Sequence, residues 1–494
     1  MAKATQDNVF DVIIIGAGIS GINSAYRVQT KIPGASYAIL ESRTAMGGTW
    51  DLFRYPGIRS DSDLHTFGFA WRPWMDVRPI ADGPAIVEYV EQSAAEYGID
   101  KHILYRHRVL DADFSSERQN WALTVEVSTD DGAEPQTKVF YGSHLVLGTG
   151  YYNYKTPLET VIPGIDSFKG TVVHPQFWPE DLDYSGKKIV IIGSGATAIT
   201  LVPTLAKTAE HVTMLQRSPT FLISQPNFAK GSWISKFLPS YFLAKLSRWK
   251  FLGLRQIFYL FCQVWPQTAR NLLIKATKRQ LPKHISVEPH FQPKYNPWEQ
   301  RLCLCPDGDF FKALRGGKAN VATGEIDTVT EHGVTLKSGE KLEADMIVTA
   351  TGLKLQIAGG IHITVDKELV EPGKKFLWRS MMLQDVPNLC FIIGYTNTSW
   401  TLGADASVLL FCRIINEIRR QKATSAVPFL EHPELMKPMS AFNLSSTYIE
   451  KAKHLIPRCG DSGPWMPRDN YYRDTWTAWF GSIHKGLLYK KVST

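Results

Sequence analysis

Cysteine is scarce in this sequence, and no two cysteines form a recognisable pair. The six cysteines among 494 residues are scattered, with no CxxC pair and no spacing typical of a metal site. A disulfide scaffold and a thiolate metal centre are therefore excluded, and no metal is expected. Isolated thiols are typical of proteins kept in a reducing compartment, which favours a cytoplasmic location.

The sequence also has no apolar run long enough to span a bilayer, which takes about 20 residues. Its longest candidate, Ile257–Trp265, is cut off by Arg255 and by Pro266. Met1–Phe10 is polar, lacks the apolar core of a secretory signal and runs straight into the strand-like Asp11–Gly16. We therefore expect neither a membrane span nor a removable signal.

Acidic residues are missing between Glu210 and Glu288, although the chain carries 47 of them and has a net charge of +8. Aromatic and aliphatic residues alternate there with basic ones at helical spacing. A membrane-surface helix and a field that attracts anionic NADPH both fit this pattern, but an inserted helical subdomain with a solvated basic face is the simplest interpretation. No nucleic-acid-binding module accompanies the charges, so nucleic acid is not an expected partner. Besides Arg217, the lysines and arginines of this stretch are Lys230, Lys236, Lys245, Arg248, Lys250, Arg255, Arg270, Lys275, Lys278, Arg279 and Lys283.

Two stretches far apart in the chain share one pattern of apolar strand, glycine turn and helix. They are Phe10–Gly21 and Lys188–Ala198. The length of the chain, with 44% hydrophobic and 21% charged residues, is too great for one core. Together these features predict an α/β protein with two dinucleotide-binding folds and a helical insertion.

In the first stretch, Gly16, Gly18 and Gly21 form GxGxxG directly after a strand, with Ser20 inside the motif. Without side chains, such a turn lets backbone N–H groups approach a pyrophosphate at a helix N-terminus. Glu41 closes the next strand about 20 residues later, where an acid hydrogen-bonds a ribose diol. These five residues are predicted to bind a dinucleotide.

The second stretch has alanine in the third glycine position, a variant that the motif permits. Its next strand, His211–Arg217, ends in an arginine rather than an acid. A guanidinium favours a 2′-phosphate, so this half is predicted to prefer NADPH over NADH. The residues predicted to bind this nucleotide are Gly193, Gly195, Ala196, Thr197 and Arg217.

Two nucleotides bound by one chain imply hydride transfer between them, hence FAD and NADPH as cofactors. Glu41 suits the unphosphorylated adenosine ribose of FAD, whereas Arg217 suits the phosphorylated ribose of NADPH. A disulfide reductase uses the same cofactors but needs a redox cysteine pair. Cys303-x-Cys305 has the wrong spacing and place for one.

The predicted domains are interleaved along the chain. We expect an FAD-binding domain in two parts (1–150 and 386–494), a connector (151–187), an NADPH-binding domain in two parts (188–217 and 301–385) and a helical insertion (218–300). Expected helices are Ile22–Thr30 and Ser407–Arg420, and Gly83–Tyr97 is an amphipathic stretch. Expected strands include Tyr37–Glu41, Lys318–Thr323, Asp345–Gly352 and Leu389–Gly394.

The connector contains FKGTVVHPQFWP, which matches the FxGxxxHxxxW(P/D) fingerprint of the type I Baeyer–Villiger monooxygenases. GGTW at 47–50 and RYPGIRSD at 54–61 resemble the family's second signature. Stretches such as HVTMLQRSPT, YNPWEQRLCL and GYTNTSWTL extend the resemblance over most of the chain, toward the subgroup typified by the ethionamide-activating monooxygenase. The fingerprint residues are Phe168, Gly170, His174, Trp178 and Pro179.

The resemblance implies an activity and assigns roles to residues. Asp61 matches the family's active-site aspartate and Arg301 its catalytic arginine. Reduced flavin and molecular oxygen would form a C4a-peroxyflavin, whose anionic form needs a permanently charged guanidinium that Asp61 would orient. The expected reactions are oxygen insertion into ketones to give esters and oxidation of organosulfur compounds, including thioamide prodrugs. Further residues expected to bind cofactor are Gly48, Thr49, Trp50 and Gly394.

Three positions qualify this interpretation. His174 lies between the nucleotide domains, so we interpret it, with Trp178, as part of a hinge rather than as a catalytic base. Gln300 stands where many family members have a lysine that helps to bind the 2′-phosphate, so NADPH preference depends more on Arg217. Phe67 stands where other branches place a tyrosine.

Two other functions remain open at this point. An N-hydroxylating or flavin-containing monooxygenase without Baeyer–Villiger activity has the same architecture but would not need Arg301. A redox-silent NADP(H)-binding regulator, anchored through the basic insertion, is the non-enzymatic alternative. The expected partners are molecular oxygen and a small ketone or organosulfur substrate, and the expected assembly is a monomer with peripheral membrane contact as an option.

Overall fold

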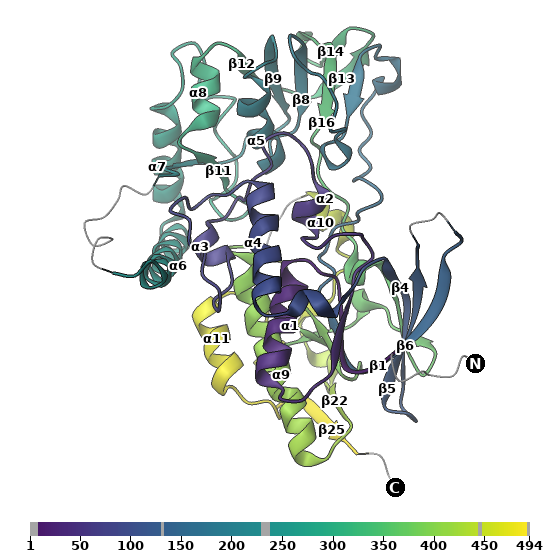
Figure 1. Ribbon diagram of the computed structural model, residues 1–494. Coiled ribbons are helices and arrows are strands. Elements are labelled where there is room, and N and C mark those ends of the chain that lie inside the picture. Colours follow the sequence, from purple (N-terminus) through teal and green to yellow (C-terminus); the bar gives the residue numbers. More distant parts are fainter. Residues whose placement is uncertain (1–7, 130–132, 229–237, 443–446, 492–494) are drawn as a thin grey trace.

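The computed structural model describes residues 8–129, 133–228, 238–442 and 447–491. Lys230 and Lys236 of the basic stretch lie outside these ranges. Two α/β folds make up the molecule, one above the other in Figure 1. None of the helices in the described ranges is long and apolar enough to cross a membrane.

The lower fold in Figure 1 is built on a nine-stranded sheet with the order β18-β17-β4-β5-β6-β1-β2-β3, and β21 pairs with β6 off this path. β1 runs parallel to both β2 and β6, and its residues Val12, Ile13 and Ile14 are fully buried. The strands are β1 (Val9–Ile15), β2 (Tyr37–Leu40), β3 (Ile103–Leu104), β4 (His107–Ser115), β5 (Asn120–Val127), β6 (Gln136–Leu147), β17 (His362–Val365), β18 (Glu368–Leu369) and β21 (Leu389–Phe391).

Helices α1 (Ile19–Lys31), α4 (Gly83–Glu96) and α9 (Trp400–Gln421) share the main core cluster with one face of this sheet. Residues near the start and the end of the chain therefore belong to one fold, with α1 and α9 side by side in Figure 1. A partly buried ion pair joins the two helices, since Arg27 Nε lies 2.7 Å from Asp405 Oδ1.

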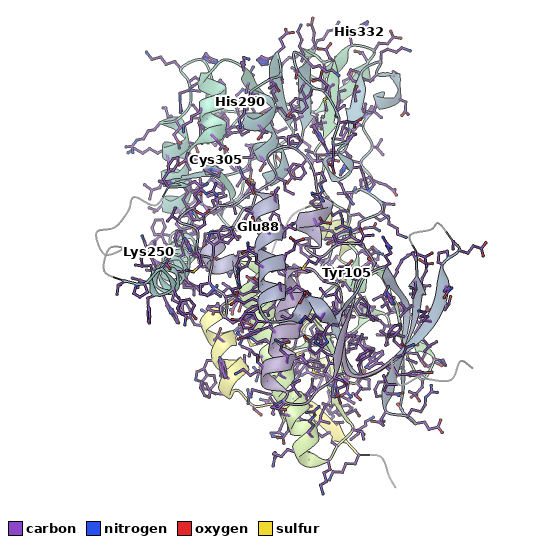
Figure 2. The ribbon with its side chains drawn as sticks, in the orientation of Figure 1. Glu88, Tyr105, Lys250, His290, Cys305 and His332 are labelled. Carbon is purple, nitrogen blue, oxygen red and sulfur yellow. The ribbon has the colours of Figure 1, made fainter. Side chains whose placement is uncertain are left out.

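The upper fold contains a five-stranded, all-parallel sheet with the order β12-β9-β8-β16-β7. Helices α5 (Ala196–Leu205) and α8 (Asp309–Arg315) pack on it through the second core cluster. Its strands are β7 (Thr171–Val173), β8 (Lys188–Ile192), β9 (His211–Gln216), β12 (Ala319–Thr323) and β16 (Met346–Thr349). The predicted α/β class with two dinucleotide-binding folds is confirmed. In Figure 2, His290 and Cys305 lie in this fold, and Glu88 lies in the lower one.

The sheets also bear on the predicted domain boundaries, which stay predictions. β7 lies within the predicted connector 151–187 but pairs with β16 in the upper sheet. β17 lies within the range assigned to the NADPH half, 301–385, but pairs in parallel with β4 of the lower sheet. Sheet pairing therefore favours a return to the lower fold between β16 and β17, earlier than residue 386.

The insertion consists mainly of two long helices, α6 (Ser240–Val264) and α7 (Pro266–Lys278). α6 lies against the short helix α3 (Leu64–Phe67) of the lower fold (Figure 1). Arg248 donates hydrogen bonds to the carbonyl oxygens of His65, Thr66 and Gly68 at the end of α3. Arg255 Nε lies 2.5 Å from the fully buried Asp63, which caps the start of α3. The basic face of this insertion is therefore not all solvated, because these two arginines fix α6 to the lower fold.

Shorter elements complete the chain. The upper part also carries a three-stranded antiparallel sheet, β13 (Ile326–Thr330), β14 (Gly333–Leu336) and β15 (Lys341–Glu343). Two-stranded pairs are β10 (Leu222–Gln225) with β11 (Cys303–Pro306), β19 (Leu377–Trp378) with β20 (Met382–Leu383), β22 (Ser425–Pro428) with β25 (Leu487–Lys490), and β23 (Met439–Ser440) with β24 (Arg458–Cys459). The remaining α-helices are α2 (Thr49–Leu52), α10 (Thr447–Ala452) and α11 (Tyr471–Phe480).

Candidate active site

A cavity of about 1480 Å³ lies where the two folds and the insertion meet. The lower fold contributes Gly16 and Gly18, two of the three glycines of its motif, and the upper fold contributes Ala196 and Thr197. One side of α6 closes the cavity. Its size is above the 300–1,000 Å³ typical of a pocket for one small molecule. The cavity therefore has room for more than a substrate. In the described ranges, no cluster of three or more His, Cys, Asp or Glu residues could hold a metal ion.

The first glycine motif is held open toward this cavity by close backbone packing. Gly16 has φ +97°, and a Cβ there would lie 2.8 Å from the carbonyl oxygen of Gly148. A Cβ on Gly21 would lie only 1.8 Å from the carbonyl oxygen of Gly16. Gly18 caps α1 without a side-chain hydrogen bond, so the N–H groups of the first helical turn are available to a ligand. This cradle fits a pyrophosphate.

Glu41 lies at the end of β2 on the wall of the same cavity. Its carboxylate accepts a hydrogen bond from Ala17 N–H at 2.7 Å and another from Arg43 N–H at 2.9 Å. Oε1 also accepts from the Ser42 hydroxyl at 3.3 Å, whereas Oε2, which accepts from Ala17, keeps a second lone pair for a ligand. Glu41 therefore offers an acceptor oxygen for the predicted ribose contact, and the N–H of Ala17 in the glycine loop holds this oxygen in place.

The second motif repeats this geometry in the upper fold. Gly193 has φ +139°, and a Cβ there would lie 2.3 Å from the carbonyl oxygen of Ala350. Gly195 caps α5 with no side-chain hydrogen bond, and a Cβ on it would meet no atom within 4 Å. The space above Gly195 is therefore open, whereas Gly193 is tightly packed.

Arg217 is exposed directly after β9, outside the lining of the cavity. Gly193 N–H donates to the carbonyl of Leu215, so the glycine turn and the end of β9 are adjacent. The Ser194 hydroxyl donates to the carbonyl of Ser218 at 3.0 Å. These two bonds bring Arg217 to the same sheet edge as the open glycine turn, where a phosphorylated ribose would extend.

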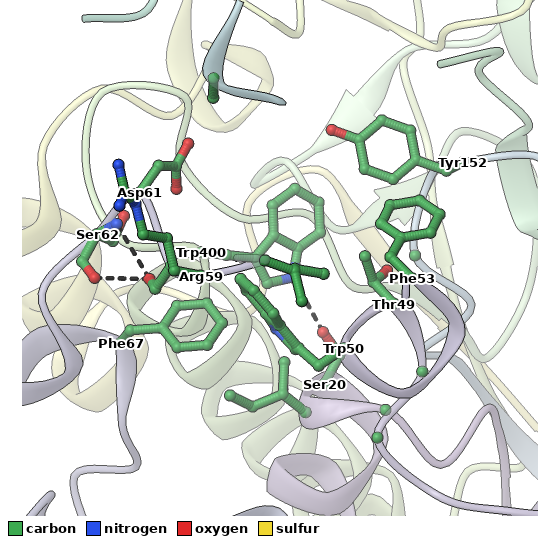
Figure 3. A pocket seen from close by; sticks show the side chains of 18 of the residues that line it. Ser20, Thr49, Trp50, Phe53, Arg59, Asp61, Ser62, Phe67, Tyr152 and Trp400 are labelled. Carbon is green, nitrogen blue, oxygen red and sulfur yellow. Dashed lines mark hydrogen bonds between the residues drawn. The ribbon is translucent and has the colours of Figure 1, made fainter. Parts of the chain in front are cut away.

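The two predicted catalytic side chains meet across the cavity. Arg301 Nη1 donates a hydrogen bond to Asp61 Oδ2 at 3.1 Å, and both side chains line the cavity. Each is about one-third exposed, at 36% and 37%, so the pair is accessible to a ligand. Arg301 lies two residues before β11, whereas Asp61 lies on a loop of the lower fold (Figure 3).

That loop is held by the upper fold. Arg59 forms an ion pair with Asp309 on α8. The Tyr55 hydroxyl hydrogen-bonds Thr197 on α5, and burial raises the pKa of Tyr55 to about 12. Gly57 has φ +75° and abuts Thr204, also on α5. The position of the Asp61 loop therefore depends on how the two folds are docked.

Aromatic side chains form one wall of the cavity (Figure 3). The Trp400 indole N–H donates to Ser20 Oγ at 3.0 Å, and its ring stacks on Tyr151 at 4.9 Å. Trp50 makes an edge contact with Phe67 at 5.7 Å. This wall suits an apolar substrate or a planar ring.

Two of the predicted cofactor contacts are arranged differently. Gly394 does not line the cavity, and a Cβ on it would lie 2.4 Å from the Trp400 ring, so this glycine makes room for the indole. Ser20 lines the cavity, but its hydroxyl is the acceptor for Trp400. Gly48, Thr49 and Trp50 line the cavity, and their contact with a cofactor stays a prediction.

Several residues that line the cavity were not predicted from the sequence. The Tyr154 hydroxyl hydrogen-bonds Thr49 Oγ1 at 3.0 Å, and Arg43 donates to the carbonyl of Gly48 at 3.1 Å. Arg43 follows Glu41 by two residues, and Arg59 shares the loop with Asp61, so proximity to the motifs was an available signal. Nothing local marks Tyr154, because its contact spans 105 residues.

The fingerprint residues Phe168, Gly170, His174, Trp178 and Pro179 do not line the cavity. Gly170 directly precedes β7, and a Cβ on it would lie 2.2 Å from the carbonyl oxygen of Asp345. Trp178 is buried in the second core cluster. His174 Nδ1 accepts a hydrogen bond from Gln176 N–H at 3.2 Å, and burial lowers the pKa of His174. This position gives no support to a catalytic base, and the hinge role stays a prediction.

Comparison with known proteins identifies a family and close relatives. The flavin-binding monooxygenase-like family matches residues 76–357, and an NAD(P)-binding Rossmann-like domain matches residues 14–79. The FAD-containing monooxygenase EthA of Mycobacterium tuberculosis is 44% identical over 485 residues, which cover 97% of this chain and 98% of that protein. The probable FAD-binding monooxygenase AlmA of Acinetobacter baylyi is 44% identical over 490 residues, covering 98% and 97%.

Solved structures share the fold at lower identity. Oxidized steroid monooxygenase bound to NADP has a TM-score of 0.75 at 19% identity and covers 98% of this chain and 100% of its own. The open structure of cyclohexanone monooxygenase has a TM-score of 0.74 at 18% identity with the same coverage. At these identities the likeness establishes the arrangement of the two folds alone.

Proposed function

Because this chain belongs to the flavin-binding monooxygenase-like family, we propose that it is an FAD- and NADPH-dependent monooxygenase of the Baeyer–Villiger type. Its reaction would insert one oxygen atom of O2 beside the carbonyl of a ketone, giving an ester, and release the other as water. Organosulfur compounds, including thioamides, would be oxidised at sulfur in the same cavity. The observation that carries the proposal is the Arg301–Asp61 pair between the two nucleotide cradles.

The residues present fit the two cofactors. Gly16, Gly18 and Glu41 would hold the pyrophosphate and adenosine ribose of FAD, because they offer free helix N–H groups and a fixed carboxylate. Gly195 would hold the pyrophosphate of NADPH at the N-terminus of α5. Arg217 would hold the 2′-phosphate, in the place where the first fold has the acidic Glu41. When bound, NADPH supplies the hydride that reduces the flavin, and reduced flavin activates O2.

Arg301 supplies a fixed positive charge where oxygen becomes negatively charged during the reaction. A guanidinium stays protonated at any working pH, so it stabilises that charge without a proton transfer of its own. Asp61 holds one edge of the guanidinium and thereby fixes its direction. Oxygen transfer to sulfur is electrophilic and depends less on a nearby positive charge. The Arg301–Asp61 pair therefore supports ketone oxidation, the reaction that needs a stabilised negative charge on oxygen.

The cavity wall supports an apolar substrate. Trp400, Trp50 and Phe67 present aromatic rings to the space beside Asp61 (Figure 3), and the indole N–H of Trp400 is already bonded to Ser20 Oγ. Such a wall excludes water from the reacting groups and accepts an alkyl chain. This supports linear or aryl-alkyl ketones and sulfides over strongly polar substrates.

Product analysis in ¹⁸O2 tests the proposal. Purified protein with FAD and NADPH is expected to convert 2-octanone to an ester carrying one ¹⁸O atom, detected by mass spectrometry. Arg301→Ala should lower ester formation by about 100-fold or more, as loss of a key charge-stabilising group does, while NADPH is still consumed and H2O2 is released.

The matched control is Arg473→Ala, which removes an arginine from an exposed ion pair with Asp469 outside the cavity. That variant should retain the wild-type rate. Undiminished ester formation by Arg301→Ala would overturn the role given to Arg301. Sulfoxide formation without any ester from the wild type would instead favour a flavin-containing monooxygenase without Baeyer–Villiger activity.

A further inference from the structure

Helix α6 has three distinct sides. Leu243, Ser247, Phe251 and Phe258 line the cavity, at intervals of four and seven residues. A second side is bound to α3 through Arg248 and Arg255. The third side is exposed to solvent, although it carries large apolar side chains.

The exposed side of α6 is apolar along its whole length. Its residues are spaced by three, four or eight positions, which places them in one stripe. Phe242, Trp249 and Ile257 are more than 60% exposed, at 62%, 64% and 67%. None of the residues of this stripe lines the cavity. The apolar stripe consists of Phe242, Leu246, Trp249, Ile257, Leu260 and Val264.

The charges on the two helices of the insertion have one sign. α6 and α7 contain no Asp or Glu, and Lys245 and Lys250 are exposed beside the stripe. Lys275 and Lys278 extend the basic character along α7. In a two-fold dimer, the same surface of each copy forms the interface. A second copy of this chain would therefore place lysines opposite lysines, which repel each other. Charge complementarity therefore favours an anionic partner.

A second aromatic face lies next to α6. On α11, Tyr472, Trp476, Trp479 and Phe480 are exposed and lie on one helix face. The two helices are neighbours on the same side of the molecule (Figure 1), and Tyr471 of α11 packs against a core cluster that contains Leu252 of α6. Exposed tryptophans beside lysines are typical of helices that lie in a membrane interface.

We propose that the apolar stripe of α6 seats this protein on the surface of an anionic lipid bilayer. Since another side of the same helix lines the cavity, the bilayer would lie within about one helix diameter, roughly 10 Å, of the active site. The substrate class would accordingly be long-chain ketones or sulfides dissolved in the membrane. This second step rests on the proposed function, whereas the membrane contact itself does not.

Vesicle sedimentation tests the contact directly. The FAD-loaded protein should co-sediment at least about tenfold more with vesicles of phosphatidylcholine containing 30% phosphatidylglycerol than with phosphatidylcholine alone, and 0.5 M NaCl should reduce the binding. The triple variant Phe242→Ser, Trp249→Ser, Ile257→Ser should lose at least about tenfold of this binding. The matched control places the same number of serines at other exposed apolar positions, Val161, Leu369 and Leu435, and should bind like the wild type.

Enzyme activity on a soluble and on a membrane-embedded ketone distinguishes the proposed membrane contact from the proposed substrate class. The triple serine variant should oxidise water-soluble 2-octanone at the wild-type rate, but should lose most of its activity on 2-pentadecanone embedded in anionic vesicles. Equal vesicle binding by the wild type and the triple variant would overturn the membrane contact. Self-association of the wild type that the triple variant abolishes, without vesicle binding, would assign the stripe to a protein interface instead. Vesicle binding without oxidation of either ketone would sink the proposed function and leave the contact intact.

Discussion

Gly18 and Gly195 adopt almost the same backbone conformation in two separate folds. Gly18 has φ −75° and ψ −177°, and Gly195 has φ −78° and ψ −178°. Each caps a helix with no side-chain hydrogen bond, and each follows by two residues a glycine in the positive-φ region. The two nucleotide sites are therefore built on one local geometry, although the residues around them differ.

Substitution of Gly195 by alanine should impair NADPH use without harming the fold. Its φ is accessible to any residue, and an added Cβ meets no protein atom within 4 Å. The methyl group would instead occupy the space through which a pyrophosphate approaches the helix N-terminus. We expect the melting temperature of Gly195→Ala to stay within about 2 °C of wild type and KM for NADPH to rise about tenfold or more.

Gly193→Ala is the comparison for this prediction. Here the added Cβ would lie 2.3 Å from the carbonyl oxygen of Ala350 at φ +139°, so the fold itself should be destabilised. Thermal unfolding and NADPH kinetics of both variants distinguish the two effects. A low melting temperature for Gly195→Ala would contradict the open space inferred above it.

Local sequence patterns predicted the parts of the fold that local geometry determines. The strand expected at Tyr37–Glu41 is β2 (Tyr37–Leu40), and the amphipathic stretch Gly83–Tyr97 forms α4 (Gly83–Glu96). The helix expected at Ser407–Arg420 begins earlier, at Trp400. Its first turns include Gly403, which packs closely on Gly394. That contact, not helix propensity, explains why a glycine lies within this helix.

The rest of the site depends on contacts between distant segments, which no local pattern records. Arg59 reaches Asp309 across 250 positions, and Tyr154 reaches Thr49 across 105. The same limit applies to the insertion, where spacing indicated a helix but not which of its sides would face the cavity. Glycine motifs were predictable because their function constrains the backbone, whereas cavity walls are set by tertiary packing.

Arg217 should decide between the two nicotinamide cofactors. It is the exposed cation at the sheet edge beside the open glycine turn, and Gln300 offers no second charge. Arg217→Ala should raise KM for NADPH by about 10- to 100-fold, the usual value of a charge-assisted bond to phosphate, and leave KM for NADH nearly unchanged. Steady-state kinetics with both cofactors measure this ratio. Lys207→Ala, an exposed cation just beyond the far end of α5, is the control, and a parallel loss with NADH would argue against a phosphate contact.

Asp61 should act through Arg301. Asp61→Ala frees the guanidinium to swing away, so ester formation should fall by about 10- to 100-fold while H2O2 release per NADPH rises. Asp61→Asn keeps an acceptor oxygen and should lose less. In a double-mutant cycle, Asp61→Ala on the Arg301→Ala background should cost little further activity, because the group it positions is gone. Additive losses from the two substitutions would show that Asp61 has an independent role.

His144 should make stability depend on pH in the acid range. Burial lowers the pKa of His144 to about 4, against an ordinary value near 6.5, and its Nδ1 lies 3.1 Å from the carbonyl oxygen of Asp11. That carbonyl can only accept, so the neutral ring donates from Nδ1. Above pH 6.5 the ring is neutral in both states and its contribution is fully present. Between pH 6.5 and 4 the ring is protonated in the unfolded chain but stays neutral in the folded chain. The free energy of unfolding therefore decreases as the pH falls, by roughly 3 kcal/mol at pH 4.

Urea unfolding at pH 7.5 and pH 5 checks this dependence. His144→Phe should lower stability at both pH values, because it removes the bond to Asp11, but should flatten the difference between them. His65, His174 and His290 have pKa values lowered by burial and keep part of the slope. The exposed His284→Phe is the control and should leave the difference unchanged. A slope in His144→Phe as steep as in the wild type would mean that the ring takes up its proton equally readily in the folded and unfolded chains, and that its burial is not what limits stability in acid.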